Sequence, residues 1–406
     1  MRRFIFCWLI GLSWLMTACQ SKPSAEPMEA VVDRGLRTAQ AHAIRMAQTL
    51  EQQPGTFPRT LDKQGKLETS DYQWWCCGFF PGELWYLYET FGTAELKQYA
   101  EQFTDRVEPA KSLTNTHDLG FMLYCSYGNG YRLTQNPAYR EIMLEGARSL
   151  ATRYNDKLGV IRSWDFNRDV WQYPVIIDNM MNLEFLLWAA KAGQEERYYD
   201  MAISHANRTL VEHYRPDYSC YHVVSYDTLT TFPHKKQTHQ GYADESAWAR
   251  GQAWGLYGYT MMYRETHINE YFIQATRIAN YLMNHPRMPE DKVPYWDLDA
   301  PDIPEATRDA SAAAIMASAL LDLAAMDQTE FGQQCLAFAE AQLRSLSSPQ
   351  YLAEPGTNGN FVLMHSTGSY PGNSEVDVPL SYADYYYVEA LLRWKKLQKQ
   401  ELNQQL

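Results

Sequence analysis

The chain has 406 residues, of which 46% are hydrophobic and 21% are charged, a balance that allows a sizeable core and excludes disorder beyond the chain ends. The formal net charge is −12 and no basic stripe is present, which argues against a nucleic-acid-binding protein. Aromatic residues reach 14%; most are expected to pack in the core, but such an excess also provides rings that stack on sugar faces.

The first residues predict export. Arginines at the start precede an apolar run at 4–16, which is too short to span a bilayer and is typical of a signal-peptide core. The small residues before Cys19 resemble a bacterial lipobox, in which that cysteine is lipidated. We therefore predict a lipoprotein-type signal peptide at 1–18, a lipidated Cys19, a flexible tether at 19–30 and a periplasmic or outer-membrane location in a bacterium. Plain secretion is the alternative.

The cysteines beyond Cys19 are odd in number and scattered, so they do not form a disulfide framework. We expect buried thiols at Cys76, Cys77, Cys125, Cys220 and Cys335. The sequence contains neither a CxxC pair nor an HExxH motif, so its spacing predicts no metal site, and nothing in it requires a cofactor.

The N-terminal third predicts helices separated by one long loop. Apolar residues at helical spacing predict a first helix at about 31–51, and Pro and Gly residues predict a loop at 52–70. A helical hairpin is expected next, with Pro81 in the first turn of its first helix and a partner helix at about 94–107.

Four apolar stretches then begin at Asp118, Asp178, Trp248 and Asp309, and each is followed by an amphipathic stretch. The starts are separated by 60, 70 and 61 residues (178−118, 248−178, 309−248). Such spacing indicates a helical array in which one end of every inner helix faces the same side. A last helix at about 382–397 brings the expected total to roughly eleven or twelve.

No change of composition marks a second domain, so we predict an all-α fold, an (α/α)6 barrel of six helical hairpins that forms a single catalytic domain over 31–400. Long loops rich in aromatic residues, Pro and Asp join the hairpins, and loops gathered on one face usually carry function. One segment within them, 220–226, alternates like a short strand.

Asp118 and Asp178 occupy the same phase of the repeat, at the predicted starts of inner helices. Taken singly, each reads as a helix cap. Taken together across a barrel mouth, two carboxylates cannot both ionise cheaply, so the pKa of one should rise. A protonated carboxyl beside an ionised one is the pair that glycoside chemistry requires.

Arg250 and Trp254 are four residues apart and therefore share one helix face. A guanidinium beside an indole suits a sugar ring that carries a carboxylate, although Arg250 could equally pair with a core Asp while the Trp packs nearby. His222, His239 and Gln240 lie in the long loop upstream, where a histidine is usually exposed or hydrogen-bonded.

Several motifs together resemble those of the unsaturated glucuronyl hydrolases, glycoside hydrolase family 88, from about Trp74 to the last helix. These motifs lie at 75–85, 117–121, 178–182, 239–242, 246–255, 308–313 and 375–386. The resemblance implies an (α/α)6 barrel that hydrolyses oligosaccharides left by polysaccharide lyases. It would remove the 4,5-unsaturated glucuronate from the non-reducing end of glycosaminoglycan-type oligosaccharides by hydrating the C4=C5 vinyl ether.

The resemblance also implies roles for individual residues. Asp178 would be the acid and base, and Asp118 the second essential carboxylate. The substrate-binding residues would be Arg250, Trp254, His222 and Gln240, with Trp75, Trp164 and Trp248 as stacking rings. A sulfate-binding Ser-x-x-Ser-x-Lys segment of some members corresponds to Ser366, Ser369 and, in place of the lysine, Pro371.

Three alternatives stay open at this point. A sister family acts on unsaturated rhamnogalacturonan with the same barrel and chemistry. An exported lipoprotein of this fold could also bind glycans without turnover. For the hydrolase as for this alternative, we expect contact with the membrane only through the N-terminal lipid anchor. A sugar epimerase would need paired histidine bases across the pocket, which the Asp pair argues against.

Overall fold

The computed structural model describes residues 26–405, with side chains described up to residue 400. The predicted signal peptide, Cys19 and most of the predicted tether lie outside these residues. Within the described part, no helix is both long enough and apolar enough to cross a membrane.

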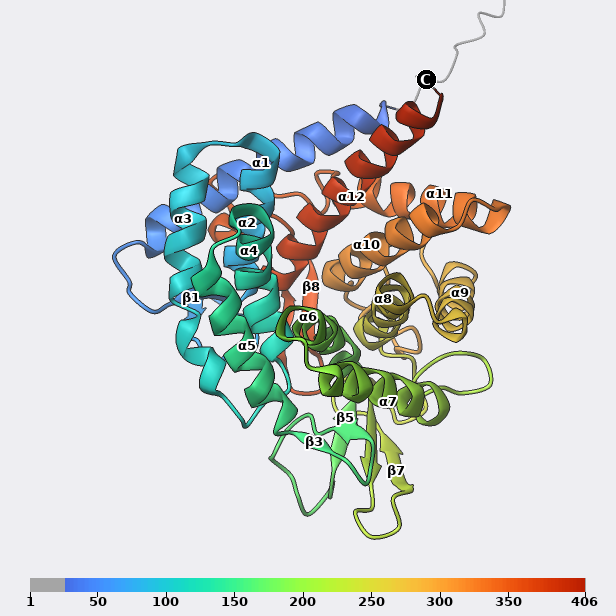
Figure 1. Ribbon diagram of the computed structural model, residues 1–406. Helices are drawn as coiled ribbons and strands as arrows, with labels where there is room; N and C mark the ends of the chain where they lie inside the picture. The colour runs from blue at the N-terminus through green and yellow to red at the C-terminus, as the bar shows by residue number, and fades with distance from the viewer. Residues whose placement is uncertain (1–25, 406) are drawn as a thin grey trace, which may run out of the picture.

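An inner ring of helices forms the centre of the fold (Figure 1). Each member packs against the next, and α12 contacts both α10 and α2, which closes the ring. In α10 every residue from 310 to 321 is buried, as expected for a helix that is apolar on all sides. The members are α2 (Phe79–Phe91), the π-helix η2 (Gly120–Gly128) continued by α4 (Asn129–Thr134), α6 (Leu183–Gly193), α8 (Ala249–Thr266), α10 (Ala310–Met326) and α12 (Ser381–Gln405).

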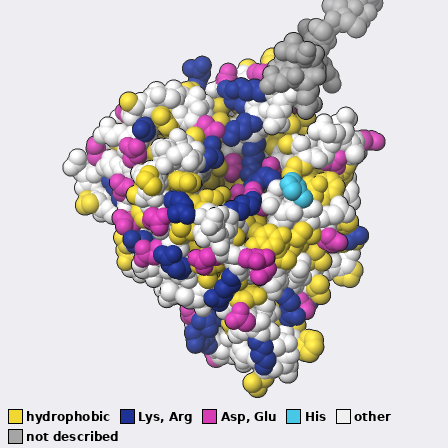
Figure 2. Space-filling view, in the orientation of Figure 1, with side chains coloured by type: hydrophobic (Ala, Val, Ile, Leu, Met, Phe, Trp, Pro, Cys, Tyr) yellow, Lys and Arg dark blue, Asp and Glu magenta, His cyan; other side chains and the backbone are white. Residues whose placement is uncertain are grey.

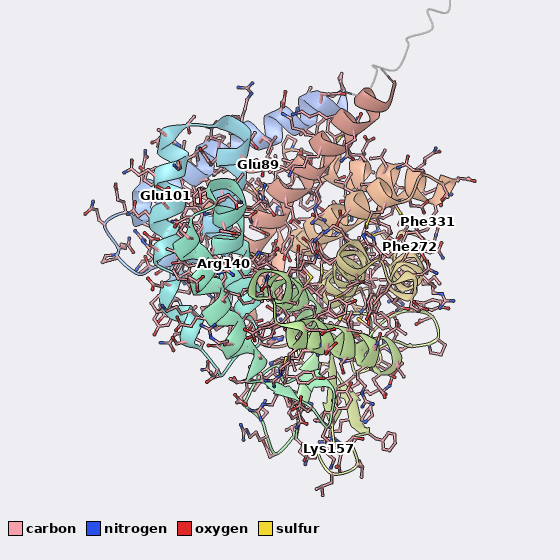
Figure 3. The ribbon with its side chains drawn as sticks, viewed as in Figure 1. Glu89, Glu101, Arg140, Lys157, Phe272 and Phe331 are labelled. Atoms are coloured by element: carbon pink, nitrogen blue, oxygen red, sulfur yellow. The ribbon has the colours of Figure 1, made fainter. Side chains whose placement is uncertain are left out.

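Amphipathic helices cover the ring, and most of them directly follow the inner helix on which they pack. They are α3 (Ala94–Asp105), α5 (Pro137–Ala151), α7 (Glu196–Glu212), α9 (Asn269–Met283) and α11 (Glu330–Leu346). Their outer faces carry charged side chains such as Glu101 on α3 and Arg140 on α5 (Figure 3). Figure 2 shows basic and acidic side chains interspersed over one face of the molecule.

The sixth outer helix, α1 (Met28–Leu50), packs against α12, so this hairpin joins the two ends of the described chain. Helix α1 begins three residues earlier than the predicted Val31 (31−28). The arrangement of six inner and six outer segments among the described residues confirms the predicted (α/α)6 barrel.

Two of the apolar stretches begin differently from the regular helices that we predicted. Residues 120–128 form a π-helix, and Asp178 lies in a 3₁₀ turn, η3 (Ile177–Asn182). The two segments touch closely: Phe121 N donates to Asn182 Oδ1 at 3.1 Å, and a Cβ on Gly120 would lie 2.7 Å from Asn182 Cα. The Asn182 side chain therefore accepts from a backbone N–H of the π-helix, and a glycine allows the two segments to approach closely at this point.

Short antiparallel strands lie beyond the helices. The predicted loop at 52–70 is wrong in part, because it contains the hairpin β1 (Phe57–Leu61) and β2 (Leu67–Ser70). The predicted strand at 220–226 is present as β6 (Val223–Tyr226), between β5 (Pro174–Ile176) and β7 (Pro233–Gln237). The other strands are β3 (Tyr154–Asn155) with β4 (Val160–Ile161), and β8 (Ser366–Ser369) with β9 (Ser374–Val378). The remaining short helices are η1 (Glu108–Ser112) and η4 (Asn358–Asn360).

The thiols predicted to be buried are buried and unpaired, at Cys76, Cys77, Cys125, Cys220 and Cys335. Their pKa values are raised chiefly by burial, which leaves them neutral and unreactive.

Candidate active site

A cavity of about 610 Å³ opens at the N-terminal ends of the inner helices. Its walls combine residues from the starts of η2, η3, α8 and α12 with residues from the long loops and the hairpins β1–β2 and β8–β9. The long loops predicted to carry function therefore do meet at one end of the barrel.

The β-sheet brings Asp178 and His222 together. Asp178 follows β5 and His222 precedes β6, and the antiparallel register pairs Ile176 with Val223. Ile177 N donates to His222 O at 3.0 Å, which fixes the join between the two strands. As a result Asp178 Oδ2 lies 3.8 Å from His222 Nε2.

The Asp178 side chain is 12% exposed, and burial raises the pKa of its carboxyl from 3.8 to about 7. The nearby charge of Asp118 raises this pKa further, whereas Arg250 and Trp254 lower it. The predicted rise in one pKa is therefore present, but its main cause is burial and not the partner carboxylate. Oδ2 accepts no hydrogen bond from any residue that the structure describes. This carboxyl can hold a proton near neutral pH and present it to the cavity.

His222 is a neutral imidazole with a defined tautomer. Its Nδ1 accepts hydrogen bonds from the backbone N–H groups of His239 (3.1 Å) and Gln240 (3.2 Å), so the ring proton resides on Nε2. Burial lowers the pKa of His222 well below its usual range. The uncharged Nε2–H group therefore faces Asp178 Oδ2, at 3.8 Å, without donating a hydrogen bond to it.

Asp118 is held on both of its oxygen atoms. Oδ2 accepts from Thr116 Oγ1 at 2.6 Å, and Oδ1 lies 3.2 Å from His117 Nε2. His117 is buried, and burial lowers its pKa, so Asp118 contacts a neutral ring here. The carboxylate that accompanies Asp178 thus has a fixed orientation at the cavity wall.

Arg250 lies at the cavity floor, and most of its donors are already used. Nη1 donates to Asp309 Oδ2 at 3.0 Å and to Thr367 O, and Nη2 donates to Gly368 O. The guanidinium also lies 4.7 Å from the Trp248 ring. The alternative of an arginine paired with a core Asp is therefore realised, while the same side chain still lines the cavity.

Only some of the predicted site residues reach the cavity surface. The wall includes Asp178, Asp118, Arg250, Gln240, Trp75, Trp164 and Ser369. The predicted binding residues that lie behind it are Trp254, Trp248, His222 and Ser366, all of them buried. Trp248 packs beneath the His222 ring at 4.5 Å, and Trp254 packs between Phe121 and Tyr386. Helical spacing indicates which side of a helix faces the site, but it does not indicate depth.

Other residues of the wall had no assigned role in the sequence. Phe166 is 47% exposed and stacks on Trp164 at 4.7 Å, extending the aromatic surface outward. Arg59 and Glu375 enter from the hairpins β1–β2 and β8–β9. The first of these hairpins lies in a predicted loop, so no signal pointed to Arg59.

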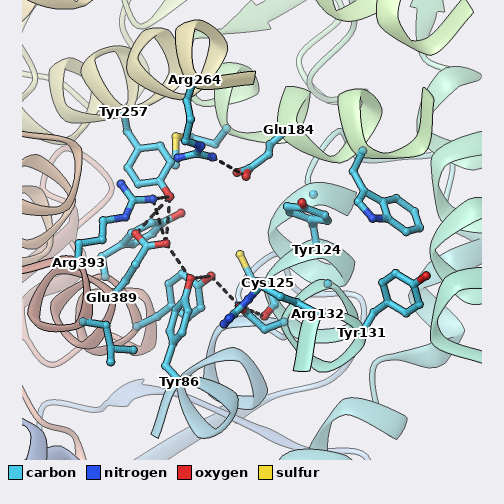
Figure 4. Close-up of a pocket in the computed structure, with 18 of the residues that line it drawn as sticks. Tyr86, Tyr124, Cys125, Tyr131, Arg132, Glu184, Tyr257, Arg264, Glu389 and Arg393 are labelled. Carbon is cyan, nitrogen blue, oxygen red and sulfur yellow. Dashed lines mark hydrogen bonds and ion pairs between the residues drawn. The ribbon is translucent and has the colours of Figure 1, made fainter. Parts of the chain in front are cut away.

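A second cavity of about 530 Å³ lies at the opposite ends of the inner helices (Figure 4). Its charged groups satisfy one another: Arg264 pairs with Glu184 at 2.6 Å, and Glu389 accepts from Tyr86 at 2.8 Å and lies 3.4 Å from Arg393. None of the predicted site residues lines it. Of the two cavities, only the first is lined by predicted site residues that the structure describes.

The sequence profile of Glycosyl Hydrolase Family 88 matches residues 46–398. The chain is 42% identical over 406 residues to the unsaturated glucuronyl hydrolase of Formosa agariphila, covering 98% of this chain and 99% of that protein. It is 35% identical over 346 residues to the unsaturated chondroitin disaccharide hydrolase of Streptococcus pyogenes serotype M1, covering 84% of this chain and 86% of that protein. The crystal structure of an unsaturated glucuronyl hydrolase specific for heparin superposes with a TM-score of 0.89 at 49% identity, covering 91% of this chain and 98% of that one. These matches confirm the resemblance found in the motifs, and the chain belongs to glycosyl hydrolase family 88.

Proposed function

We propose that the protein hydrolyses lyase-generated oligosaccharides of the glycosaminoglycan type and releases their non-reducing-end 4,5-unsaturated glucuronate. The proposal rests chiefly on Asp178, a buried carboxyl with a pKa of about 7 whose Oδ2 has no partner among the described residues. Membership of family 88 and the names of the relatives support the same reaction.

The reaction adds water across the C4=C5 bond of the vinyl ether. Protonated Asp178 donates its proton to C4, and the positive charge that develops at C5 is shared with the ring oxygen. Water then attacks C5 and gives a proton to the Asp178 carboxylate, which restores the acid. The resulting C5 hemiketal opens: the bond from C5 to the ring oxygen breaks, a ketone forms at C5, and the hydroxyl proton moves to the former ring oxygen. C1 is then a hemiacetal, which forms an aldehyde and releases the neighbouring sugar with that proton on its oxygen.

The neighbouring side chains prepare Asp178 for both steps. The charge of Asp118 favours the protonated form of Asp178, and its hydrogen bond from Thr116 and its contact with His117 hold it in place. The Nε2–H of His222 can orient the carboxylate or the attacking water without adding a charge. Arg250 supplies a buried positive charge that attracts the substrate carboxylate and keeps the pKa of Asp178 from rising further.

The test is a spectrophotometric assay of the chain beginning at Ser24. Unsaturated heparin disaccharides are the first substrates, because a structure at 49% identity is named as heparin-specific, and unsaturated chondroitin and hyaluronan disaccharides follow. We expect the ultraviolet absorbance of the C4=C5 bond to disappear. Asp178→Asn should reduce turnover by roughly 10²-fold or more, whereas the exposed Asp33→Asn should leave it unchanged.

Stable absorbance with all these disaccharides and with a rhamnogalacturonan-derived one would contradict the proposal and favour a glycan-binding protein. Cleavage of the rhamnogalacturonan disaccharide alone would assign the chain the sister activity. Full turnover by Asp178→Asn would remove Asp178 from the mechanism.

We also propose that Cys19 carries a lipid and anchors the exported protein in the periplasm or at the outer membrane. The support is the apolar run at 4–16 and the small residues that precede the cysteine. Incorporation of labelled fatty acid in the expressing bacterium, lost in Cys19→Ser, is the expected result.

A further inference from the structure

Arg59 is turned out of its strand toward the cavity by a β-bulge. The register of β1 and β2 pairs Pro58 with Thr69 and Thr60 with Glu68, which leaves Arg59 as the unpaired extra residue. Bulges redirect a side chain in this way, often beside active sites. Arg59 accordingly lines the same cavity as Asp178.

The guanidinium of Arg59 is held on two sides. Nε donates to Glu375 Oε1 at 2.6 Å, and Cζ lies 4.2 Å from the centre of the Trp74 ring. The terminal nitrogens Nη1 and Nη2 donate no hydrogen bond to any residue that the structure describes. A rigidly placed pair of donors is therefore left free.

The position of Glu375 is itself fixed. Its backbone has φ +57°, and a Cβ on Gly368 would lie 2.4 Å from its Oε2, so only glycine leaves room for the carboxylate there. Gly368 O also accepts from Arg250 Nη2 and, at 3.0 Å, from Gln240 Nε2. The donors of Arg59 are thus positioned relative to the cavity floor through β8 and β9.

The two arginines of the cavity wall occupy different depths. The whole Arg250 residue is 1% exposed, whereas the Arg59 side chain is 26% exposed and rests on Trp74, a residue 36% exposed. Arg59 therefore stands nearer the mouth, where the sugar after the uronate would lie. Both terminal nitrogens of Arg250 already donate, and Pro371 occupies the place of the lysine that binds sulfate in some members of the family.

We propose that Arg59 binds a sulfate group, as ester or sulfamate, on the sugar that follows the unsaturated glucuronate. This inference rests on the proposed function for the placement of the two sugars. Two in-plane N–H donors match an oxyanion in geometry, and charge-assisted bonds of this kind are among the stronger ones. Because Glu375 balances the charge of Arg59, we expect Arg59 to recognise the sulfate through short-range hydrogen bonds. These bonds should favour the sulfated over the unsulfated disaccharide by roughly tenfold in Kd.

The experiment measures binding, so that it does not depend on turnover. Calorimetry gives Kd for sulfated and unsulfated unsaturated heparin disaccharides with Asp178→Asn, and with the same protein carrying Arg59→Gln. We expect the preference for the sulfated disaccharide to fall by roughly tenfold in the double variant, with less than threefold change for the unsulfated one. Arg287→Gln, which alters an exposed ion-paired arginine outside the cavity, is the matched control and should change neither value.

An equal loss of affinity for both disaccharides would show that Arg59 only supports the cavity wall, and an unchanged preference would show that it does not bind the sulfate. Either result overturns the inference while leaving the hydrolase activity intact. If Arg59→Gln does not fold, Arg59→Lys serves in its place: it keeps the charge but loses the planar pair of donors, and part of the preference should disappear.

Discussion

Replacing Asp178 with Asn should make the protein more stable, and increasingly so as the pH rises. The folded-state pKa of this carboxyl is about 7 against an ordinary value of 3.8. Folding therefore favours the protonated form: the stabilising contribution is complete below about pH 3.8 and is lost as the pH rises through 7. Asn cannot ionise, so the variant escapes this loss.

The size of the effect follows from the shift. A difference of about 3 pKa units corresponds to at most about 4 kcal/mol. By linkage, the wild type has already lost about 1.7 kcal/mol of this stability at pH 5. The stability difference between Asp178→Asn and the wild type should therefore grow by about 2.5 kcal/mol between pH 5 and pH 8. An unfolding entropy of about 2.1 cal/mol/K per residue gives about 0.8 kcal/mol/K for a chain of this size, and hence a growth in the Tm difference of about 3 °C.

The assay is thermal unfolding of wild type and Asp178→Asn in matched buffers from pH 5 to pH 8. Other buried carboxyls, such as Asp384 with a pKa raised by burial to about 8, titrate in both proteins and cancel in the difference. Asp33→Asn, on an exposed side chain of α1, should keep a constant difference from wild type. A constant difference for Asp178→Asn as well would refute the raised pKa, and with it the role of Asp178 as a proton donor near neutral pH.

Further changes test the neighbouring groups. Asp118→Asn removes a charge that raises the pKa of Asp178, so the alkaline limb of the kcat/KM profile, expected near pH 7 in wild type, should move to lower pH; an unmoved limb would show that the two carboxyls do not interact. Arg250→Ala leaves the buried Asp309 Oδ2 and Thr367 O without their donor and removes one of the two donors to Gly368 O, so thermal unfolding should show a loss of about 3–5 kcal/mol and kinetics a raised KM. Unchanged stability would mean that Asp309 is satisfied in another way.

The barrel was predictable because its inner and outer helices bury different amounts of surface. Inner segments such as 310–321 are apolar on all sides, outer ones are amphipathic, and their alternation is visible as a repeat in the sequence. The same repeat placed Asp118 and Asp178 at one end of the barrel, where both line the cavity.

The remaining features depend on contacts between distant segments, which local patterns do not encode. The π-helix after Asp118 occurs where its backbone contacts Asn182, and Arg250 donates its hydrogen bonds to Asp309 and to a carbonyl group of β8. The strands of the β1–β2 hairpin are short, and β2 is largely exposed, so its sequence shows no alternation of polar and apolar residues. Arg59 could not be recognised as a cavity residue without that hairpin.

The pairing of α1 with α12 has a consequence for how the molecule is made. Their first residues, Met28 and Ser381, are 353 positions apart (381−28), so this contact has a very high contact order, whereas the other hairpins form from neighbouring helices. During synthesis the hairpins of neighbouring helices can form early, but the inner ring cannot close until α12 has been synthesised. Because Tyr382 of that helix forms part of the cavity wall, the active site is completed only when the last of the described helices has been synthesised.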